Sequence, residues 1–589
     1  MTARFRQVGV LCLTLGLAAA APGISGAQAF DHGHPAHVCG TDLSSPEALR
    51  ALDDFRQARD AGLLVRAAKT ASPPDIGDRR TFRVSEDSWV EMEFELLDKE
   101  DGLYYLWAEV GEISTGRITP EVVAGLRTAL VESTPGSIIN EDAGVMANNE
   151  AVLGPPPDYD GDGMTDVLMY DIQPSAQNAG SYVAGYVHSS DINPNASPTQ
   201  GNQADILYLD SNQGIRNNST ASTAAHEYAH LIHFATGFDT ETFISEGIAE
   251  YLTVVNNLGR SRYSFLGLSE ETSKPLFSWG TGTQITRDYA RAELFFRYIG
   301  EQHSPQAVAQ IAANTAKGAD GIDAVLRSLG TSLDETVLDY HSANLVHELR
   351  MGGAFSYGPG VEATGARATV HTTWSGAGSA ETPAFEQGQL PGVESGAVNY
   401  IEFTNVADLH LVLDAAAAPI ILDAARETIS ARAFFQDELG TWSASDIETR
   451  SQGYVFPGNF YRVRLVVANV KPGRTFQTRY DYAASWLGFG QATSAEDPVE
   501  IPGETALEQN YPNPFNPTTR IRFRLESAGP AHLYVVDALG RRVATLADGH
   551  HPSGDHEVSF RADRLPSGSY LGVLEADGQR LTIPMLLVR

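Results

Sequence analysis

The sequence predicts a multidomain protein in which an α+β domain, with a mixed sheet first and helices afterwards, is followed by two β-sandwich modules. Three observations lead to this prediction. The 589 residues are enough for about three or four domains. In residues 81–352 the strand patterns come first and the helix patterns follow. From residue 396 onward, short alternating apolar runs are separated by Gly- and Pro-containing turns, which is typical of sandwiches.

The composition excludes some classes of partner. Lys and Arg total 41 against 74 Asp and Glu, which gives a net charge of −33. Nucleic acids and anionic membranes attract basic surfaces, so neither is an expected partner. After the N-terminus, no stretch is long and apolar enough to span a bilayer.

Residues 1–29 have the pattern of a signal peptide. Arg4 and Arg6 precede the apolar run VGVLCLTLGLAAAA, and Ala27-Gln28-Ala29 matches a cleavage site. The run is too short for a stable membrane span, and a buried first helix is the less favoured interpretation. We therefore expect a mature chain that begins near Phe30 and is secreted or held at the cell surface.

Residues 30–80 are predicted to be an N-terminal extension and a candidate propeptide. Ser45 and Pro46 favour the start of a helix from about residue 47 to residue 69, and SPPDIGD then forms a linker. Alternation over residues 81–112 predicts paired strands with a turn at 98–102.

An aspartate-rich loop precedes the predicted strand VLMYDI, and Thr119 with Pro120 starts a helix before it. The DxDxDGxxD spacing of the loop matches the first part of a calcium loop, in which alternate Asp oxygens converge on a hard cation. Met169 stands where a bidentate Glu would be, and a strand follows instead of a helix. Two interpretations stay open, a Ca²⁺ site and an Asp/Gly turn. The candidate ligands are Asp158, Asp160, Asp162 and Asp166.

A zinc-site motif follows the predicted strand DILYLDS, on a helix predicted over residues 222–236. His226 and His230 are four residues apart, so both lie on one face of that helix. Two imidazoles in that register can reach one Zn²⁺ at about 2.0–2.1 Å. Glu227 would lie beside the metal, where it can take a proton from a water molecule that zinc activates.

A zinc enzyme needs a third protein ligand. The compact extension of the motif is excluded, because His233 and Thr236 occupy the positions that would hold Gly and a ligand. Glu246 is suitable instead, since fifteen residues separate it from His230 and a second helix is predicted over 240–256. Glu250, one turn further on, could hold a ligand histidine by a hydrogen bond. Further helices are predicted at 286–302, 304–315, 320–329 and 332–348.

The segments HEYAHLIHF and FISEGIAEY resemble the gluzincin metallopeptidases, in particular the hyicolysin-like group, over residues 80–350. VLMYDI, ILYLDS and RDYARAELFFRYI belong to the same resemblance. It implies a zincin-like fold for residues 81–352 and zinc bound by His226, His230 and Glu246, with Glu227 as the catalytic base. Ser245 replaces the usual Asn. Tyr289 is the candidate for stabilising the oxyanion, although a packed helix residue is an equal interpretation.

Cys39 is the single cysteine of the expected mature chain, because Cys12 lies in the signal peptide. No intramolecular disulfide can then form. HVCGT resembles the short Cys-Gly segments of cysteine-switch propeptides, in which a thiolate occupies the open zinc position until the segment is cut away. An incidental thiol is the alternative interpretation.

The C-terminal part is predicted as a linker at 353–395, a sandwich at 396–490, a second linker at 491–503 and an Ig-like module at 504–589. YPNPFNPTT resembles the start of the sorting domains used by type IX secretion, which implies the secretion machinery as a partner. An ordinary accessory β-domain is the alternative.

The expected activity is zinc-dependent hydrolysis of protein or peptide substrates. An endopeptidase is favoured over an aminopeptidase, because no Gly-x-Met-x-Asn-type segment that would hold a free amine precedes the zinc helix. A catalytically inactive cell-surface binding or adhesion protein on the same scaffold is the alternative from another class.

Overall fold

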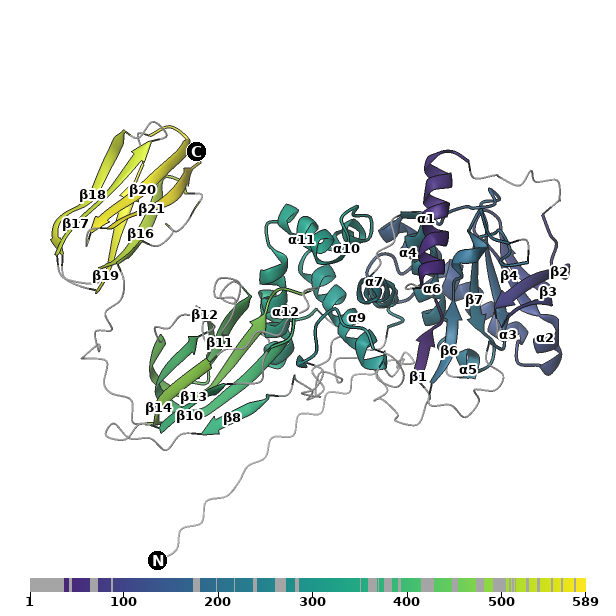
Figure 1. The fold of residues 1–589 in the computed structure, drawn as a ribbon, viewed down its shortest axis with the longest axis horizontal. Helices are drawn as coiled ribbons and strands as arrows, with labels where there is room; N and C mark the ends of the chain where they lie inside the picture. Colours follow the sequence, from purple (N-terminus) through teal and green to yellow (C-terminus); the bar gives the residue numbers. More distant parts are fainter. Residues whose placement is uncertain are drawn as a thin grey trace, which may run out of the picture. The chain divides into compact units, whose positions relative to one another are not determined.

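In the computed structural model the chain divides into two compact units, residues 1–492 and 493–589, and each is described by itself (Figure 1). The predicted signal peptide and the turn expected at 237–239 lie outside the described residues. The structure describes residues 36–41, 45–63, 73–85, 88–172, 181–197, 199–216, 218–236, 241–259, 272–280, 285–349, 351–358, 368, 370–375, 384–389, 393–414, 428–447, 454–472, 481–490, 505–507, 510, 513, 515–525, 529–537, 541–551, 554–562, 565–576 and 579–588.

Seven strands form a mixed sheet in the first unit: β1 (Ala36–Cys39), β2 (Arg79–Ser85), β3 (Trp89–Glu100), β4 (Tyr104–Glu109), β5 (Thr165–Tyr170), β6 (Ser181–Tyr186) and β7 (Ile206–Asp210). Their order is β1-β6-β7-β5-β4-β3-β2. The central strands β7, β5 and β4 run parallel, whereas β3 and β6 pair antiparallel with their inner neighbours. β1 adds to β6 in parallel, so the start of the described chain covers what would otherwise be the edge of the sheet.

Side chains of the central strands alternate between two apolar layers. In β5, Val167 and Met169 belong to a core shared with the helices, whereas Leu168 and Tyr170 belong to an aromatic-rich layer on the other face. Both faces of this strand are covered, which agrees with the continuous apolar run VLMY in the sequence.

The helices of this unit are α1 (Pro46–Asp60), α2 (Val110–Thr115), α3 (Pro120–Arg127) with a π-helical turn (Thr128–Glu132), α4 (Val145–Leu153), α5 (Gln213–Arg216), α6 (Thr220–Thr236), α7 (Thr242–Val255), α9 (Ile285–Gln302), α10 (Pro305–Ala312), α11 (Gly318–Ser328) and α12 (Leu333–Val346). The sequence analysis predicted all of these except α2, α4 and α5. The side chains of Ser45 and Thr119 cap α1 and α3 as expected. The predicted end of the first helix at residue 69 is wrong, because α1 stops at Asp60 and Gly62 follows in a left-handed conformation (φ 66°).

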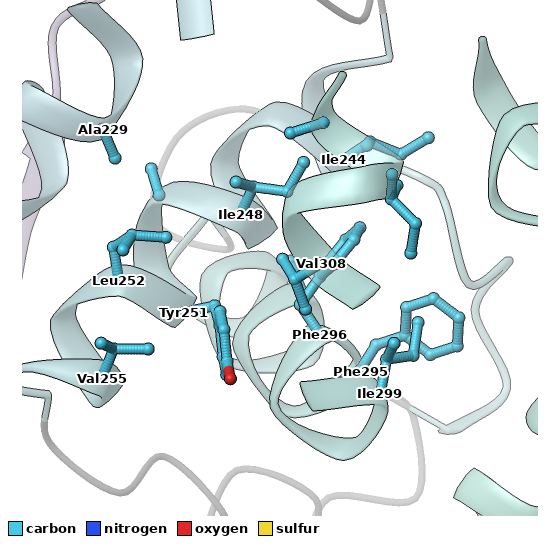
Figure 2. Packing of buried hydrophobic residues seen from close by; sticks show 14 of the residues in the cluster. Ala229, Ile244, Ile248, Tyr251, Leu252, Val255, Phe295, Phe296, Ile299 and Val308 are labelled. Carbon is cyan, nitrogen blue, oxygen red and sulfur yellow. The ribbon is translucent and has the colours of Figure 1, made fainter. Parts of the chain in front are cut away.

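Helix α6 packs on β6 and β7, and α7 lies between α6 and α9. Figure 2 shows Ile248 and Tyr251 of α7 on the side of Phe296 of α9. Gly247 makes this close approach feasible, since a Cβ added there would lie 2.4 Å from the Phe296 ring. The packing fixes α7, and therefore the side chains on its other faces, against α6.

Seven further strands form one sheet in the second half of the first unit: β8 (Thr372–Ser375), β9 (Ala384–Gln389), β10 (Val398–Asp414), β11 (Ile429–Asp437), β12 (Trp442–Ile447), β13 (Tyr454–Asn469) and β14 (Asp481–Gly488). β8 and β9 lie inside the segment expected to be a linker, and they pair with β10 and β14. The two facing sheets expected for 396–490 are replaced, among the described residues, by this single sheet. One face packs on α12 through residues such as Tyr400 and Val466, and Phe403 and Leu465 form the core of the other.

The second unit consists of β15 (Ala506–Leu507), β16 (Thr518–Leu525), β17 (Gly529–Asp537), β18 (Arg542–His551), β19 (Gly554–Arg561), β20 (Gly568–Ala576) and β21 (Gln579–Leu587). They form the sheets β15-β16-β19 and β18-β17-β20-β21. Phe523 of the first sheet and Leu533 and Leu574 of the second belong to one buried core, so this unit is a sandwich. Among the described residues of the whole chain, no helix is long and apolar enough to cross a membrane.

Polar groups join α12 to the second sheet. Arg464 is buried and pairs with Glu402 (3.0 Å) and Glu348 (2.8 Å). The Nε2–H of His341 donates to the carbonyl of Gly396 (2.8 Å), and the Tyr400 hydroxyl donates to the carbonyl of His341 (3.0 Å). Burial lowers the pKa of His341 to about 4, although its hydrogen bond to Gly396 opposes this shift.

The depressed pKa of His341 predicts that acid weakens this interface. His341 stays neutral in the folded protein until about pH 4, whereas it takes a proton in the unfolded chain near pH 6.5, so its contribution to stability is present above pH 6.5 and is lost as the pH falls towards 4. Between pH 7 and pH 5 this group should cost about 2 kcal/mol of unfolding free energy.

The measurement is urea unfolding at both pH values for the wild type and the His341→Gln variant, whose amide can still donate to a carbonyl. The variant should lose less stability than the wild type over this interval. An identical loss in both proteins would contradict the prediction.

Candidate metal centre and active site

Helices α6 and α7 bring together the three side chains expected to bind zinc. The Nε2 atoms of His226 and His230 are 3.0 Å apart, and Oε2 of Glu246 lies 3.1 Å from the first and 3.6 Å from the second. Donor atoms around a tetrahedral Zn²⁺ lie about 3.3 Å apart, because the bonds to zinc are about 2.0–2.1 Å long. The two imidazoles and the carboxylate therefore fit a zinc ion in both donor type and spacing.

The charged groups of this centre are buried. His226, Glu227, His230, Glu246 and Glu250 are exposed by 6%, 1%, 0%, 3% and 6%. Three carboxylates thus share a low-dielectric site with two imidazoles. Burying ionised carboxylates is unfavourable unless positive charge accompanies them, so a divalent cation suits this set.

The pKa values follow from the same arrangement. Burial alone would raise the pKa of Glu246, but the contacts with His230 and His226 outweigh it and lower the pKa to about 2. Burial alone would lower the pKa of His226, but the hydrogen bond to Glu246 and the charges of Glu227 and Glu250 raise it to about 9. Burial raises the pKa of Glu227, which favours a carboxyl group that can hold a proton.

A cavity beside the centre contains the proposed catalytic groups. The hydroxyl-bearing ring of Tyr289, on α9, makes an edge contact with the His226 ring at 6.1 Å between centroids. Glu250 Oε1 lies 3.5 Å from Nδ1 of His226, where it can hold the ring and fix its tautomer. The lining residues are Cys39, Ala184, Ser222, Thr223, His226, Glu227, Glu250, Thr253 and Tyr289.

Residues 39–41 of the N-terminal extension contact two of the residues that line this cavity, Glu227 and Tyr289. The Cys39 thiol lies 3.5 Å from Glu227 Oε2, and the Thr41 hydroxyl donates to the same oxygen at 2.9 Å. The Cys39 amide donates to the Tyr289 hydroxyl at 3.1 Å. Sγ of Cys39 also belongs to the group of donor atoms, with His226, His230 and Glu246, that lie within 4.8 Å of one another.

The predicted calcium residues are only partly brought together. Asp158 and Asp160 form a group with Asp205, whose side chain the sequence analysis did not consider. Asp166 is directed elsewhere, since its carboxylate accepts from the Trp107 indole (2.7 Å) and pairs with Arg80 (3.9 Å). Burial and the neighbouring Asp162 raise the pKa of Asp160 to about 6.

Thr41, Asp205 and strand β1 are not predicted from the sequence. Thr41 follows the Cys-Gly pair directly, so the resemblance to a propeptide switch pointed to its neighbourhood but not to its contact with Glu227. Asp205 stands at the start of a buried strand with no motif of its own. His233, which was not proposed as a ligand, is buried and lies outside the donor group.

Comparison with known proteins gives one sequence relative. The chain is 26% identical over 170 residues to the neutral metalloprotease ShpI of Staphylococcus hyicus, an alignment that covers 26% of this chain and 38% of ShpI. The chain thus spans less than half the length of this relative. No protein-family profile matches the chain.

Similarities to solved structures are weak. PorZ, a surface component of the type IX secretion system of Porphyromonas gingivalis, is 15% identical over 26% of this chain and 22% of its own, with a TM-score of 0.11. A β-glucuronidase of Faecalibacterium prausnitzii is 8% identical over 32% and 36% of the two chains, with a TM-score of 0.13. At these scores neither similarity bears on fold or function.

The donor geometry predicts that Glu246 is needed for metal retention and Glu250 is not. The wild type should hold one zinc ion per chain at this centre after dialysis, because the ligands are preformed and buried. Glu246→Ala removes a ligand and should lose the ion. Glu250→Gln, one turn along the same helix, should keep it with an affinity lower by about 10–100-fold.

Zinc content measured by mass spectrometry after dialysis against a weak chelator tests this prediction. Equal zinc in the wild type and the Glu246→Ala variant would exclude Glu246 as a ligand.

Proposed function

We propose that this protein is a secreted zinc-dependent metallopeptidase and that it acts as an endopeptidase. The observation that carries the proposal is the convergence of His226, His230 and Glu246 on one buried point with Glu227 beside it in a cavity. The similarity to ShpI supports the reaction class.

Zinc held by these three residues would polarise the scissile carbonyl and lower the pKa of a water molecule. Glu227 takes a proton from the attacking water and passes it to the leaving amine. Its raised pKa suits both roles, because the group must bind and then release the proton near neutral pH. The Tyr289 hydroxyl, which lines the same cavity, would donate a hydrogen bond to the developing oxyanion.

The path of the N-terminal segment supports endopeptidase action. Residues 36–41 run past the centre as one continuous chain, paired with β6 through Cys39 and bonded to Gly185 by the Gly40 amide at 2.8 Å. Cys39 lies at the catalytic groups with chain on both of its sides. A groove that accepts a polypeptide in this way is open at both ends, whereas an aminopeptidase closes one end around the free amine.

We further propose that residues 39–41 hold the enzyme latent. They contact Tyr289 and Glu227, and Sγ of Cys39 lies within 4.8 Å of the donor atoms of the candidate metal ligands. A Cys39 thiolate would take the fourth position at zinc, and the Thr41 hydroxyl donates a hydrogen bond to Glu227, the proposed base. Cleavage after the segment would free the edge of β6, whose backbone groups can then pair with a substrate chain.

Export and sorting complete the proposal. The signal-like residues 1–29 would direct export, and YPNPFNPTT would make the C-terminal sandwich a sorting domain read by type IX secretion. A sandwich of this size is compatible with that role.

The first test is the Glu227→Gln variant of the proteolytically activated protein. The amide keeps the shape of the side chain but cannot take a proton, so peptidase turnover should fall by about 10²–10⁴-fold or more while zinc content stays unchanged. Cleavage products of a peptide library distinguish internal cleavage from removal of N-terminal residues. Turnover equal to that of the wild type would refute the assignment, and the absence of peptidase activity in the activated wild type would favour a binding protein.

The second test addresses latency. Uncleaved Cys39→Ala and Thr41→Val proteins should each be more active than the uncleaved wild type, and the double variant more active than either, because the two side chains block different groups. Gln57→Ala is the control, since the side chain of Gln57 donates to Asp53 on the exposed side of α1.

Activity of all uncleaved proteins is measured relative to the wild type activated by limited proteolysis. A double variant as inactive as the uncleaved wild type, beside an active cleaved protein, would contradict the latch without affecting the proposed reaction.

A further inference from the structure

A second group of acidic side chains lies at the start of the central strands, away from the candidate zinc ligands. Carboxylate oxygens of Asp158, Asp160 and Asp205 all lie within 4.8 Å of one another. The first two belong to the loop before β5, and the third directly precedes β7. Since β5 and β7 are neighbouring parallel strands, the group joins two segments that are far apart in the sequence.

Asp205 is the most unusual member. Its side chain is 1% exposed. One oxygen, Oδ2, accepts the Tyr159 amide at 2.6 Å, whereas the buried Oδ1 has no hydrogen-bond partner among the described residues. A buried carboxylate oxygen without a donor is unfavourable by itself and points to a ligand that the protein chain does not supply.

The loop is folded so that carboxylates face this oxygen. Asp158 has a positive φ of 48°, and Gly161 and Gly163 have φ values of 74° and 68°. The Gly163 amide donates to Oδ1 of Asp158 (2.8 Å) and the Asp162 amide to Oδ1 of Asp160 (3.1 Å). Each of these two bonds uses one oxygen of the carboxylate.

The positive charge of Arg80 is paired with a carboxylate outside this group. Within the described part of the chain, the guanidinium of Arg80 pairs with Asp166 at 3.9 Å. Asp205 instead has Asp158, Asp160 and Asp166 as its charged neighbours. Three carboxylates at this spacing repel one another, and a cation between them would turn the repulsion into attraction.

We propose that Asp158, Asp160 and Asp205 bind a calcium ion. The donors are oxygens only, which selects a hard cation over zinc. Oxygens on opposite sides of a Ca²⁺ ion lie about 4.6–5.2 Å apart, which accommodates the observed spacing. The site differs from the one expected from sequence, because Asp205 supplies a ligand, whereas Asp162 and Asp166 lie outside the group.

Calcium at this position would tie the beginnings of β5 and β7 together. The Asp166 amide already donates to the carbonyl of Asp205 at 2.8 Å, and the ion would add a link between their loops. β7 leads through α5 to the zinc helix α6. The ion therefore stabilises the framework behind the active site, and this inference does not depend on the proposed peptidase activity.

Thermal unfolding of the full-length protein tests the proposal. The protein is stripped of metals, reloaded with Zn²⁺ and heated with or without CaCl₂, or with MgCl₂ at the same concentration. Calcium should raise the melting temperature by several degrees, and magnesium should raise it less. No shift with calcium, or an equal shift with magnesium, would overturn the calcium assignment.

Variants locate the ion. Asp205→Asn should abolish the calcium-dependent shift, and Asp160→Asn, on the more accessible loop, provides the same test if the first variant does not fold. Asp191→Asn is the matched control, because Asp191 is equally buried but accepts hydrogen bonds from Asn202 and Tyr208. A full calcium shift in both Asp205→Asn and Asp160→Asn would overturn the site.

Discussion

Burial of the Glu246 carboxylate against two imidazoles is the interaction on which the rest of the candidate active site depends. The contacts with His226 and His230 lower its pKa to about 2 in spite of the burial, so Glu246 stays ionised. Its position comes from helix packing. Gly247, the next residue, lets α7 approach Phe296 of α9 so closely that any side chain would collide there. The metal centre thus uses residues from one face of α7 that the core holds in place on another.

The same principle of close approach explains how the N-terminal segment reaches the centre. Gly40 lies so close to β6 that an added Cβ would be 2.6 Å from Val183. Gly185, the register partner of Cys39 on β6, has no room for a side chain, since an added Cβ would lie 2.6 Å from Thr223 and 2.7 Å from the Tyr208 carbonyl oxygen. Because Gly40 has no side chain, the backbone of residues 39–41 can pair closely with β6. This pairing brings both Cys39 and Thr41 to Glu227. In the proposed latch, the block on Glu227 would therefore arise from strand register as much as from the affinity of a thiol for a metal.

The parts of this structure that sequence predicted are those set by local spacing. His226, His230 and Glu250 follow from helical periodicity. Glu246 follows from the number of residues needed to end one helix, turn and begin the next. Asp205 and Thr41 could not be predicted, because their contacts with Tyr159 and Glu227 span 46 and 186 residues. The single second sheet was mistaken for a sandwich for a related reason. Both of its faces are apolar, and only the fold reveals that a helix, α12, covers one of them.

Two cation sites within one domain must select different ions. The centre on α6 and α7 combines imidazole nitrogens with a carboxylate and a nearby thiol, a set that prefers zinc. The proposed calcium site has carboxylates alone and lies where loops, not helices, present them. Nitrogen and sulfur donors bind calcium poorly, and a donor set of carboxylates alone suits a hard cation such as calcium better than zinc. Donor chemistry would therefore separate the two ions although both carry a charge of +2, so that the proposed calcium ion would stabilise the sheet while the proposed zinc ion would serve the reaction.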